Sequence, residues 1–228
     1  MKVVLVTGGS SGLGASVVAA AAKEGWQPYV LDRQAPVSPV DGASWVECDL
    51  ADTRAAEDAT RRIAAEAGRL DAAVTAAGVD VPGRLVDVPA EVWERTVTID
   101  LLATAAVVRA ALPALERAHG TVVTVASTLG LKAVSDATAY CAAKFGVVGF
   151  TRALAAELAG TVGVTLLVPG GMRTPFFDGR DEQYKPGPDA QLNDPDSTAA
   201  AVMFALNQPP GSAVREIVVC AERESSYP

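Results

Sequence analysis

Residues 2–14 read Lys2-Val-Val-Leu-Val-Thr7 followed by Gly8-Gly9-Ser10-Ser11-Gly12-Leu13-Gly14. The first part is a short apolar run rich in β-branched residues, and an Ala-rich stretch follows the glycines. This order predicts a strand, a glycine loop and a helix. Glycine lets the backbone approach a pyrophosphate closely, and the N–H groups at a helix start favour its negative charge. We therefore expect a dinucleotide site, although a glycine-rich turn also serves a plain strand-to-helix reversal.

A second strand is predicted over residues 27–31, and it ends at Asp32, about twenty residues beyond the glycine loop. In dinucleotide-binding folds an acid at this place accepts hydrogen bonds from the adenosine ribose. A carboxylate at roughly 4 Å from the 2′-phosphate of NADP costs about 4 kcal/mol per pair of unit charges at an effective dielectric near 20. Arg33 offsets part of this cost, and Ser11, which is not basic, precedes Gly12. We expect NAD(H) to be preferred, with NADP(H) as the alternative.

Apolar, strand-like runs recur along the chain and alternate with helical patterns. This alternation predicts a doubly wound parallel sheet with helices on both faces, in one α/β domain spanning residues 1–228. Ligands of such sheets bind beyond the carboxyl ends of the strands. The predicted strands are Lys2–Thr7, Pro28–Asp32, Ser44–Cys48, Asp71–Thr75, Thr121–Ala126, Val162–Val168 and Arg215–Cys220.

Tyr140 and Lys144 stand four residues apart, thirteen residues after Ser127. On a helix this spacing places both side chains on one face. There an ammonium favours the phenolate and lowers the pKa of the phenol from its usual value of about 10. Such a tyrosine can pass a proton to or from an alcohol. The same pair also occurs on ordinary solvated helices, so its interpretation depends on the surrounding motifs.

From Lys2 to about Ala221 the chain resembles the short-chain dehydrogenase/reductase family. The resemblance implies a Rossmann-type sheet of about seven strands and an NAD(P)-dependent oxidoreductase that acts on a secondary alcohol or ketone and needs no metal. The motifs that carry it are Thr7-Gly8-x-x-x-Gly12-x-Gly14, Asp49-Leu50, Thr75-Ala76-Ala77-Gly78, the trio Ser127, Tyr140 and Lys144, and Pro169-Gly170 followed by Thr174.

The resemblance also implies a role for each matching residue. Tyr140 is expected to be the general acid or base, Ser127 to steady the substrate oxygen, and Lys144 to bind the nicotinamide ribose while lowering the Tyr140 pKa. The residues expected to bind the cofactor are Gly8, Ser10, Ser11, Gly12, Leu13, Gly14, Asp32, Arg33, Asp49, Leu50, Ala76, Ala77, Gly78, Tyr140, Lys144, Pro169, Gly170, Met172 and Thr174.

Asp100 departs from the family pattern, because the family usually carries an Asn at this place in the long helix before the catalytic strand. An ionised Asp100 near Lys144 would compete with Tyr140 for the ammonium, whereas a neutral one would still hold a relay water. Asp100 could instead be a surface or capping residue. This departure supports a second hypothesis, a catalytically weak or silent protein of the same fold that binds a nicotinamide as a sensor or partner. The larger related epimerases also use Tyr-x-x-x-Lys, but this chain is too short for their added substrate domain.

The polar, Pro- and Gly-rich segment 176–197 follows the motif on the nicotinamide side. Long loops at this place often form substrate lids, although a mobile surface loop is the alternative. The predicted substrate residues are Phe176, Phe177 and Tyr184 in this segment, with Leu129, Lys132 and Val134 opposite.

Composition restricts the partners. The net charge of −8 and the lack of a basic cluster argue against nucleic acid and anionic membranes. No apolar run approaches the eighteen residues of a membrane span, and because the first residues are predicted to form a strand, we expect no signal peptide. The cysteines Cys48, Cys141 and Cys220 lie far apart without metal-ligand spacing. These features predict a cytoplasmic protein.

Two helical stretches, residues 91–116 and 139–159, are apolar or small around most of their circumference. One sheet face covers only one side of a helix, so a second surface must cover the rest. We expect a homodimer or homotetramer, because the family commonly pairs these helices between subunits. Membrane association is the alternative, which the charged Arg152 and Glu157 disfavour.

Overall fold

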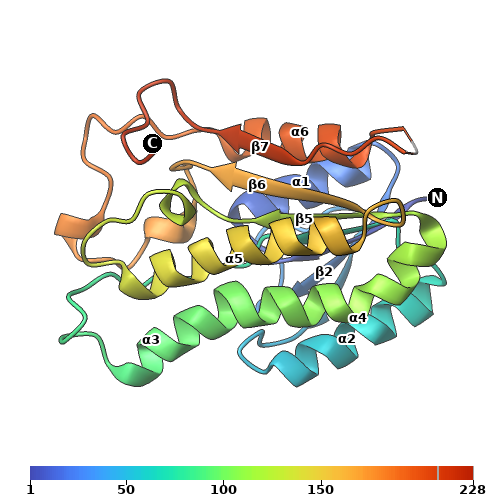
Figure 1. Cartoon of the computed structure of the whole chain (residues 1–228), viewed down its shortest axis with the longest axis horizontal. Helices are drawn as coiled ribbons and strands as arrows, with labels where there is room; N and C mark the ends of the chain where they lie inside the picture. The colour runs from blue at the N-terminus through green and yellow to red at the C-terminus, as the bar shows by residue number, and fades with distance from the viewer. Residues whose placement is uncertain (210, 228) are drawn as a thin grey trace.

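The computed structural model describes residues 1–209 and 211–227 of the chain (Figure 1). Strands and helices alternate from β1 to β7, as the sequence predicts, except that β3 follows β2 without a helix between them. The elements are β1 (Val3–Thr7), α1 (Gly12–Lys23), β2 (Gln27–Asp32), β3 (Ser44–Glu47), α2 (Thr53–Ala67), β4 (Ala72–Thr75), α3 (Ala90–Val97), α4 (Ala103–Ala118), β5 (Thr121–Val125), α5 (Thr138–Glu157), β6 (Gly163–Pro169), α6 (Pro195–Leu206) and β7 (Glu216–Val219).

The seven strands form one sheet in the order β3-β2-β1-β4-β5-β6-β7, and every neighbouring pair is parallel. The central strands are buried on both faces: all five residues of β1 and all four of β4 are buried. This explains why they read as continuous apolar runs and not as alternating ones. The strand order reverses direction between β1 and β4, and α/β sheets bind ligands at such a switch point. The predicted Rossmann-type fold is confirmed.

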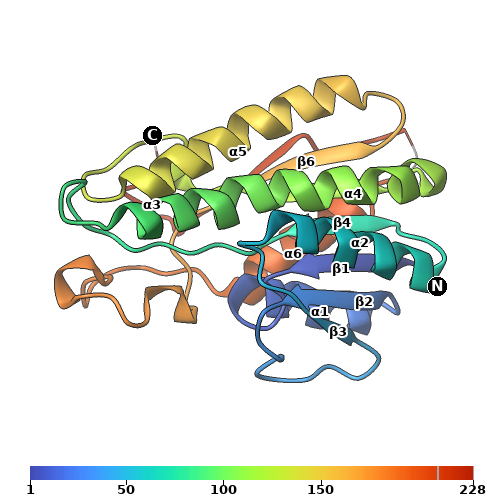
Figure 2. The same ribbon diagram turned by 90° about the horizontal axis from the view of Figure 1, so that it is seen from below.

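Helices cover both faces of the sheet (Figure 2). Apolar residues of α2, α4 and the end of α5 pack in one core against one face, and those of α1 and α6 pack in a second core against the other. Local signals set the ends of these helices. The Asp52 carboxylate accepts hydrogen bonds from the N–H groups of Arg54 and Ala55 at the start of α2, and Gly68, with φ of 71°, ends it.

Residues 90–118 form one long helical segment in which a π-helical turn, Thr98–Leu102, joins α3 to α4. By length and hydropathy this segment could cross a membrane, which the sequence analysis did not anticipate. However, 56% of its most apolar window is buried inside the protein, as is common for a core helix. Such π-turns inside α-helices are frequent at functional sites, and this one contains Asp100.

The segment 176–197 is more ordered than the sequence analysis expected. It follows β6 and contains two short 3₁₀ turns, Pro175–Phe177 and Glu182–Tyr184, and a parallel bridge joins Met172 to Asn193. Helix α6 begins at Pro195, so the last three residues of the predicted loop belong to that helix. The aspartate before α6, Asp194, accepts a hydrogen bond from the N–H of Asp196 and so determines where the helix starts.

Candidate active site

A cavity of about 780 Å³ lies beyond the carboxyl ends of the strands. Figure 1 shows that the β6 and β7 arrows point toward this side of the molecule, where the orange segment after β6 also lies. The volume suits a cofactor together with a small substrate. Most predicted site residues line the cavity: Gly8, Ser11, Gly12, Leu13, Gly14, Asp32, Arg33, Asp49, Leu50, Ala76, Ala77, Gly78, Ser127, Leu129, Tyr140, Lys144, Pro169, Gly170, Met172, Thr174, Phe176 and Phe177.

The glycine loop has no space for side chains at its key positions. Gly8 has φ of 68°, and a Cβ added there would lie 2.6 Å from the Cα of Ala77. A Cβ at Gly14 would overlap the carbonyl oxygen of Gly8, and Gly12 has φ of 53°. Helix α1 begins at Gly12, so its first N–H groups face the cavity beside this loop. The glycines therefore let the loop pack closely against the end of β4 and the start of α1, and the pyrophosphate site at this helix start stays a prediction.

Asp32 ends β2, where its carboxylate accepts hydrogen bonds from the N–H groups of Ser10 (3.1 Å) and Gln34 (3.2 Å). Ser10 itself is buried and does not line the cavity, so it would affect cofactor binding only by positioning the Asp32 carboxylate. Asp49 accepts two hydrogen bonds from Arg95, at 3.1 and 3.0 Å. Both acids lie at the end of the cavity next to the glycine loop, which the sequence assigned to the adenosine.

Ser127, Tyr140 and Lys144 come together at the other end of the cavity. Tyr140 and Lys144 lie on α5 and are 8% and 3% exposed. The Lys144 Nζ is 5.4 Å from the centroid of the Tyr140 ring and donates a hydrogen bond to the Val125 carbonyl at 3.1 Å. The Ser127 Oγ accepts a hydrogen bond from the N–H of Leu129 at 3.1 Å, which leaves its own O–H free to donate elsewhere.

Asp100 is fully buried beneath this group, so the reading of it as a surface or capping residue is wrong. Its Oδ2 lies 3.5 Å from the Lys144 Nζ, and its Oδ1 accepts a hydrogen bond from the N–H of Val79 at 2.8 Å. Burial raises the pKa of Asp100 to about 6, although Lys144 and the Val79 hydrogen bond act against this rise. A Cβ added at Gly78 would lie 3.4 Å from both charged groups, so the glycine permits their close approach to the strand end.

The residues of this chain raise the pKa of Tyr140, whereas the sequence analysis expected them to lower it. Burial raises the pKa of Tyr140, and the negative charge of Asp100 raises it further; the Ser127 hydroxyl, as a hydrogen-bond partner, acts in the opposite direction. The expectation counted the Lys144 ammonium alone. Asp100 neutralises that ammonium at 3.5 Å, and the low-dielectric surroundings disfavour the phenolate.

The residues expected near the nicotinamide lie where β6 ends. Gly170 donates its N–H to the Val219 carbonyl at 2.9 Å, which ties this turn to β7. The Thr174 Oγ1 accepts a hydrogen bond from the N–H of Phe176 at 3.4 Å and caps the following 3₁₀ turn. Thr174 also approaches the glycine loop, because a Cβ added at Gly12 would lie 3.3 Å from its Cβ. The two cofactor motifs therefore meet across the cavity.

The predicted substrate residues divide into two groups. Phe176, Phe177 and Leu129 line the cavity. Lys132, Val134 and Tyr184 do not. The Lys132 Nζ donates to the Ser225 carbonyl at 3.0 Å, and Val134 is 43% exposed. The loop after β5 turns Lys132 and Val134 away from the cavity, and Tyr184 ends a 3₁₀ turn outside it, which a count of residues does not reveal.

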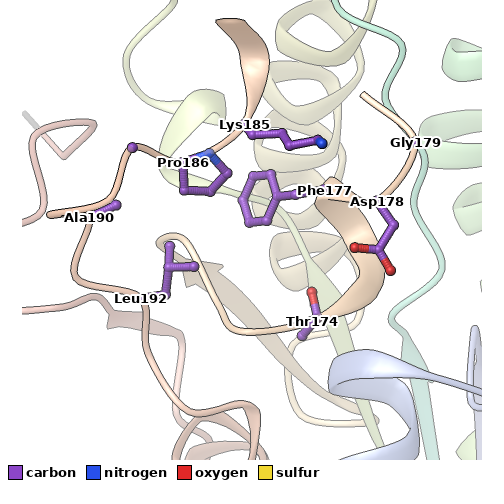
Figure 3. A pocket seen from close by; sticks show the side chains of 9 residues that line it. Thr174, Phe177, Asp178, Gly179, Lys185, Pro186, Ala190 and Leu192 are labelled. Atoms are coloured by element: carbon purple, nitrogen blue, oxygen red, sulfur yellow. The ribbon is translucent and has the colours of Figure 1, made fainter. Parts of the chain in front are cut away.

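A second pocket, of about 520 Å³, adjoins the main cavity beneath the segment after β6. Figure 3 shows Phe177 pointing into this pocket, with Pro186 on one side and Asp178 on the other. Thr174 and Phe177 line both spaces. The segment 176–194 therefore forms one wall of the main cavity.

Several residues that line the cavity were missed by the sequence analysis. Asp80 and Arg180, which are 100 positions apart in the chain, form an ion pair at 3.1 Å. No local pattern in the sequence signals this contact. The C-terminal tail also lines the cavity: Glu224 accepts a hydrogen bond from the N–H of Gly171 at 3.0 Å, and the Ser226 hydroxyl lies 2.6 Å from that of Thr128.

Comparison with known proteins agrees with this geometry. A family model described as short chain dehydrogenase matches residues 2–185. D-threitol dehydrogenase of Mycolicibacterium smegmatis is 34% identical over 220 residues, which cover 89% of this chain and 85% of that protein. Meso-2,3-butanediol dehydrogenase of Serratia marcescens is 30% identical over 192 residues, which cover 81% and 76%. The structure of 3-ketoacyl-(acyl-carrier-protein) reductase from Brucella melitensis complexed with NADH has a TM-score of 0.87 and 26% identity and covers 98% of both chains.

Proposed function

The chain belongs to the short-chain dehydrogenase family, and from that premise we propose that it transfers a hydride between NAD(H) and a secondary alcohol or ketone, with Tyr140 as general acid or base. The relatives are dehydrogenases of alcohols, so this chain is an oxidoreductase of the same family that acts on alcohols. The proposed hydride and proton chemistry is supported by the meeting of Ser127, Tyr140 and Lys144 in the same cavity as the glycine loop. A nucleotide-binding protein without chemistry has no use for that trio.

When bound, a nicotinamide cofactor supplies the site that accepts or gives the hydride. The glycine loop and Asp32 would hold its adenosine and pyrophosphate, and Lys144 and Thr174 would hold the nicotinamide end. The chain then has two tasks: to fix the substrate oxygen and to move one proton.

Ser127 and Tyr140 are proposed to fix the substrate oxygen between them. The Ser127 hydroxyl already accepts the N–H of Leu129, so its proton is directed to another acceptor. The Tyr140 hydroxyl gives its proton to a carbonyl oxygen in reduction and takes one from the alcohol in oxidation. Both side chains are more than nine-tenths buried, so little bulk water competes for the same oxygen.

Lys144 and Asp100 are proposed to replenish the proton of Tyr140. Lys144 has three donors, of which one goes to the Val125 carbonyl and another faces Asp100. The pKa of Asp100, raised to about 6 by burial, lies close enough to neutrality for this carboxyl to take up and release a proton. Asp100 therefore serves as a positioning and relay residue in the place where the family usually has an Asn.

The preference for NAD(H) is proposed on the geometry of Asp32. Two backbone N–H groups hold its carboxylate in the cavity beside Arg33. A 2′-phosphate placed there meets like charge at short range, whereas ribose hydroxyls find an acceptor.

The test of the proposed chemistry is turnover of a panel of ketones with NADH and with NADPH, repeated with Tyr140→Phe. The proposal expects a loss of about 100-fold or more in kcat for Tyr140→Phe, because general acid–base groups typically contribute that much. Tyr184→Phe is the matched control, because Tyr184 does not line the cavity. Unchanged turnover in Tyr140→Phe would refute the assigned role. Binding of NADH without turnover by the unaltered protein would favour the sensor hypothesis.

A homodimer or homotetramer is also proposed. Leu102, at the end of the π-helical turn before α4, and Phe145, on α5, are 51% and 44% exposed, as expected of an apolar surface that another subunit covers. Light scattering on the purified protein at micromolar concentration measures the mass directly, and a monomer would refute this part of the proposal.

A further inference from the structure

A buried ion pair lies in the cavity outside the catalytic trio and the glycine loop. The Arg180 Nη2 lies 3.1 Å from the Asp80 Oδ2, and the two side chains are only 9% and 6% exposed. Asp80 follows β4, whereas Arg180 belongs to the segment after β6. Both residues line the cavity together with Tyr140. The proposed proton chemistry makes no use of either residue.

The guanidinium of Arg180 lies close to two phenylalanine rings, one of which is next to Tyr140. Its Cζ lies 4.6 Å from the ring centroid of Phe176 and 4.9 Å from that of Phe177. The Phe176 ring lies 5.6 Å from the Tyr140 ring. The Phe176 ring is therefore a neighbour of both the guanidinium and the phenol. The Asp80 and Arg180 charges both act on the Tyr140 pKa, the first raising it and the second lowering it. The Phe176 and Phe177 ring centroids are only 5.5 Å apart, so both rings lie on one side of the guanidinium and leave its N–H edge available for polar contacts.

That edge lacks hydrogen bonds. Arg180 Nε and Nη2 are buried, and neither has a hydrogen-bond partner of acceptable geometry within residues 1–209 and 211–227, even though Nη2 is near Asp80. Buried donors in native proteins are nearly always paired. The Nε and Nη2 donors of an arginine lie side by side and match two oxygens, or one oxygen shared between them. We therefore expect a ligand oxygen to accept hydrogen bonds from Nε and Nη2 at this edge.

The charge of Asp80 restricts what this ligand can be. A carboxylate has about four lone-pair sites, and one ion pair leaves others open to a donor. A ligand carboxylate would meet like charge beside Asp80, and a ligand cation would meet like charge beside Arg180. A hydroxyl group satisfies both partners, since it accepts from Arg180 and donates to Asp80.

We propose that Asp80 and Arg180 bind a second oxygen of the substrate, on the carbon next to the reacting one, so that the substrates are vicinal diols and α-hydroxy ketones. This inference rests on the proposed function and names its substrate class. The second oxygen is neither oxidised nor reduced, so the redox step of the proposed function is unchanged. The competing explanation is that the pair only tethers the segment 176–194 to the end of β4.

The test compares three ketones with the same four-carbon chain and a carbonyl at the second carbon: 3-hydroxybutan-2-one, 2-butanone and 2-oxobutanoate. With NADH, the unaltered protein should reduce the hydroxy ketone with a kcat/KM about 10- to 100-fold above that of 2-butanone, the value of one or two hydrogen bonds to charged groups. Equal or faster reduction of 2-butanone would overturn the inference while leaving the proposed function intact, and so would preference for 2-oxobutanoate. No reduction of any ketone with NADH or NADPH would overturn both.

The variants Arg180→Gln and Asp80→Asn separate recognition from tethering. Recognition predicts that kcat/KM for the hydroxy ketone falls about 10-fold or more further than kcat/KM for 2-butanone in each variant, so that most of the preference is lost. The loss of either charge also acts on Tyr140, but that effect applies to both substrates and leaves their ratio unchanged. If the pair is purely structural, kcat/KM should fall by the same factor for both ketones. A constant ratio of the two kcat/KM values would therefore overturn the inference. Arg173→Gln is the matched control, because Arg173 forms an exposed ion pair with Asp194 at 3.2 Å at the base of the same segment. If Arg180→Gln fails to fold, the ratio in Asp80→Asn and in the unaltered protein decides.

Discussion

Replacement of Asp100 by asparagine should move the pH dependence of alcohol oxidation toward lower pH. The ionised carboxylate stands against the phenolate of Tyr140 and neutralises the ammonium of Lys144. Asparagine removes this charge and keeps an oxygen that can accept the N–H of Val79. The phenolate should therefore form more easily in Asp100→Asn, and the pKa that limits oxidation should fall.

The distances bound the size of this effect. Asp100 Oδ2 lies 3.5 Å from Lys144 Nζ, which lies 5.4 Å from the Tyr140 ring centroid, so the carboxylate is within about 9 Å of the ring. At an effective dielectric of about 20, two unit charges at that separation interact by about 2 kcal/mol. About 1.4 kcal/mol corresponds to one pKa unit. The pKa that limits alcohol oxidation should therefore fall by at least about one unit in Asp100→Asn.

The assay is kcat/KM for oxidation of a secondary alcohol with NAD⁺ from pH 6 to pH 10.5, for the unaltered protein and Asp100→Asn. Asp58→Asn, which removes an exposed carboxylate from α2, is the control and should leave the profile in place. An unchanged profile in Asp100→Asn would refute the electrostatic reasoning. A shift toward higher pH would show that Asp100 acts mainly by holding Lys144 in place.

Three further predictions concern stability and cofactor choice. Burial raises the pKa of Asp100 to about 6 in the folded chain, above about 3.9 in the unfolded chain, so this group's stabilising contribution is greatest at low pH and is lost as the pH rises from about 4 to 6. Between pH 4.5 and 7, urea unfolding should therefore show the unaltered protein losing about 2 kcal/mol more than Asp100→Asn, and equal losses would contradict the raised pKa. Asp32→Asn should lower KM for NADPH by at least about tenfold. This is less than the full charge repulsion would give, because Arg33 already offsets part of it. If the ratio of KM for NADPH to KM for NADH stays unaltered in steady-state kinetics, the assigned ribose contact is wrong. At Gly8, φ is 68° and an added Cβ would lie 2.6 Å from the Cα of Ala77. Gly8→Ala should therefore lower the free energy of unfolding by about 2 kcal/mol or more and weaken NADH binding. Calorimetry that shows neither effect would mean that the loop can relax around the added methyl group.

Local patterns in the sequence were enough for the framework of the site. The strand and glycine loop of residues 2–14 and the four-residue spacing of Tyr140 and Lys144 depend on interactions within a few residues. Their structural placement agrees with prediction to within one or two residues. Strand ends in a parallel sheet converge on one edge, so the cofactor loop and the trio could be expected to meet.

Contacts between distant segments were beyond prediction. Lys132 and Val134 turn away from the cavity because the loop after β5 packs on the C-terminal tail. Arg180 reaches Asp80 only because the segment after β6 folds back over the end of β4. Side chains in irregular segments follow no period, so sequence spacing does not tell which way they point.

Residue order was sufficient to predict the sheet, the glycine loop and the residue types of the catalytic trio, because periodicity and glycine geometry act locally along the chain. The charge balance of the site, in contrast, depends on how the chain packs. The Tyr140 pKa is raised, not lowered, because folding buries the phenol and brings Asp100 beside Lys144. Burial and charge proximity are properties of three-dimensional packing, and a distance of 3.5 Å between residues 44 positions apart cannot be read from their order.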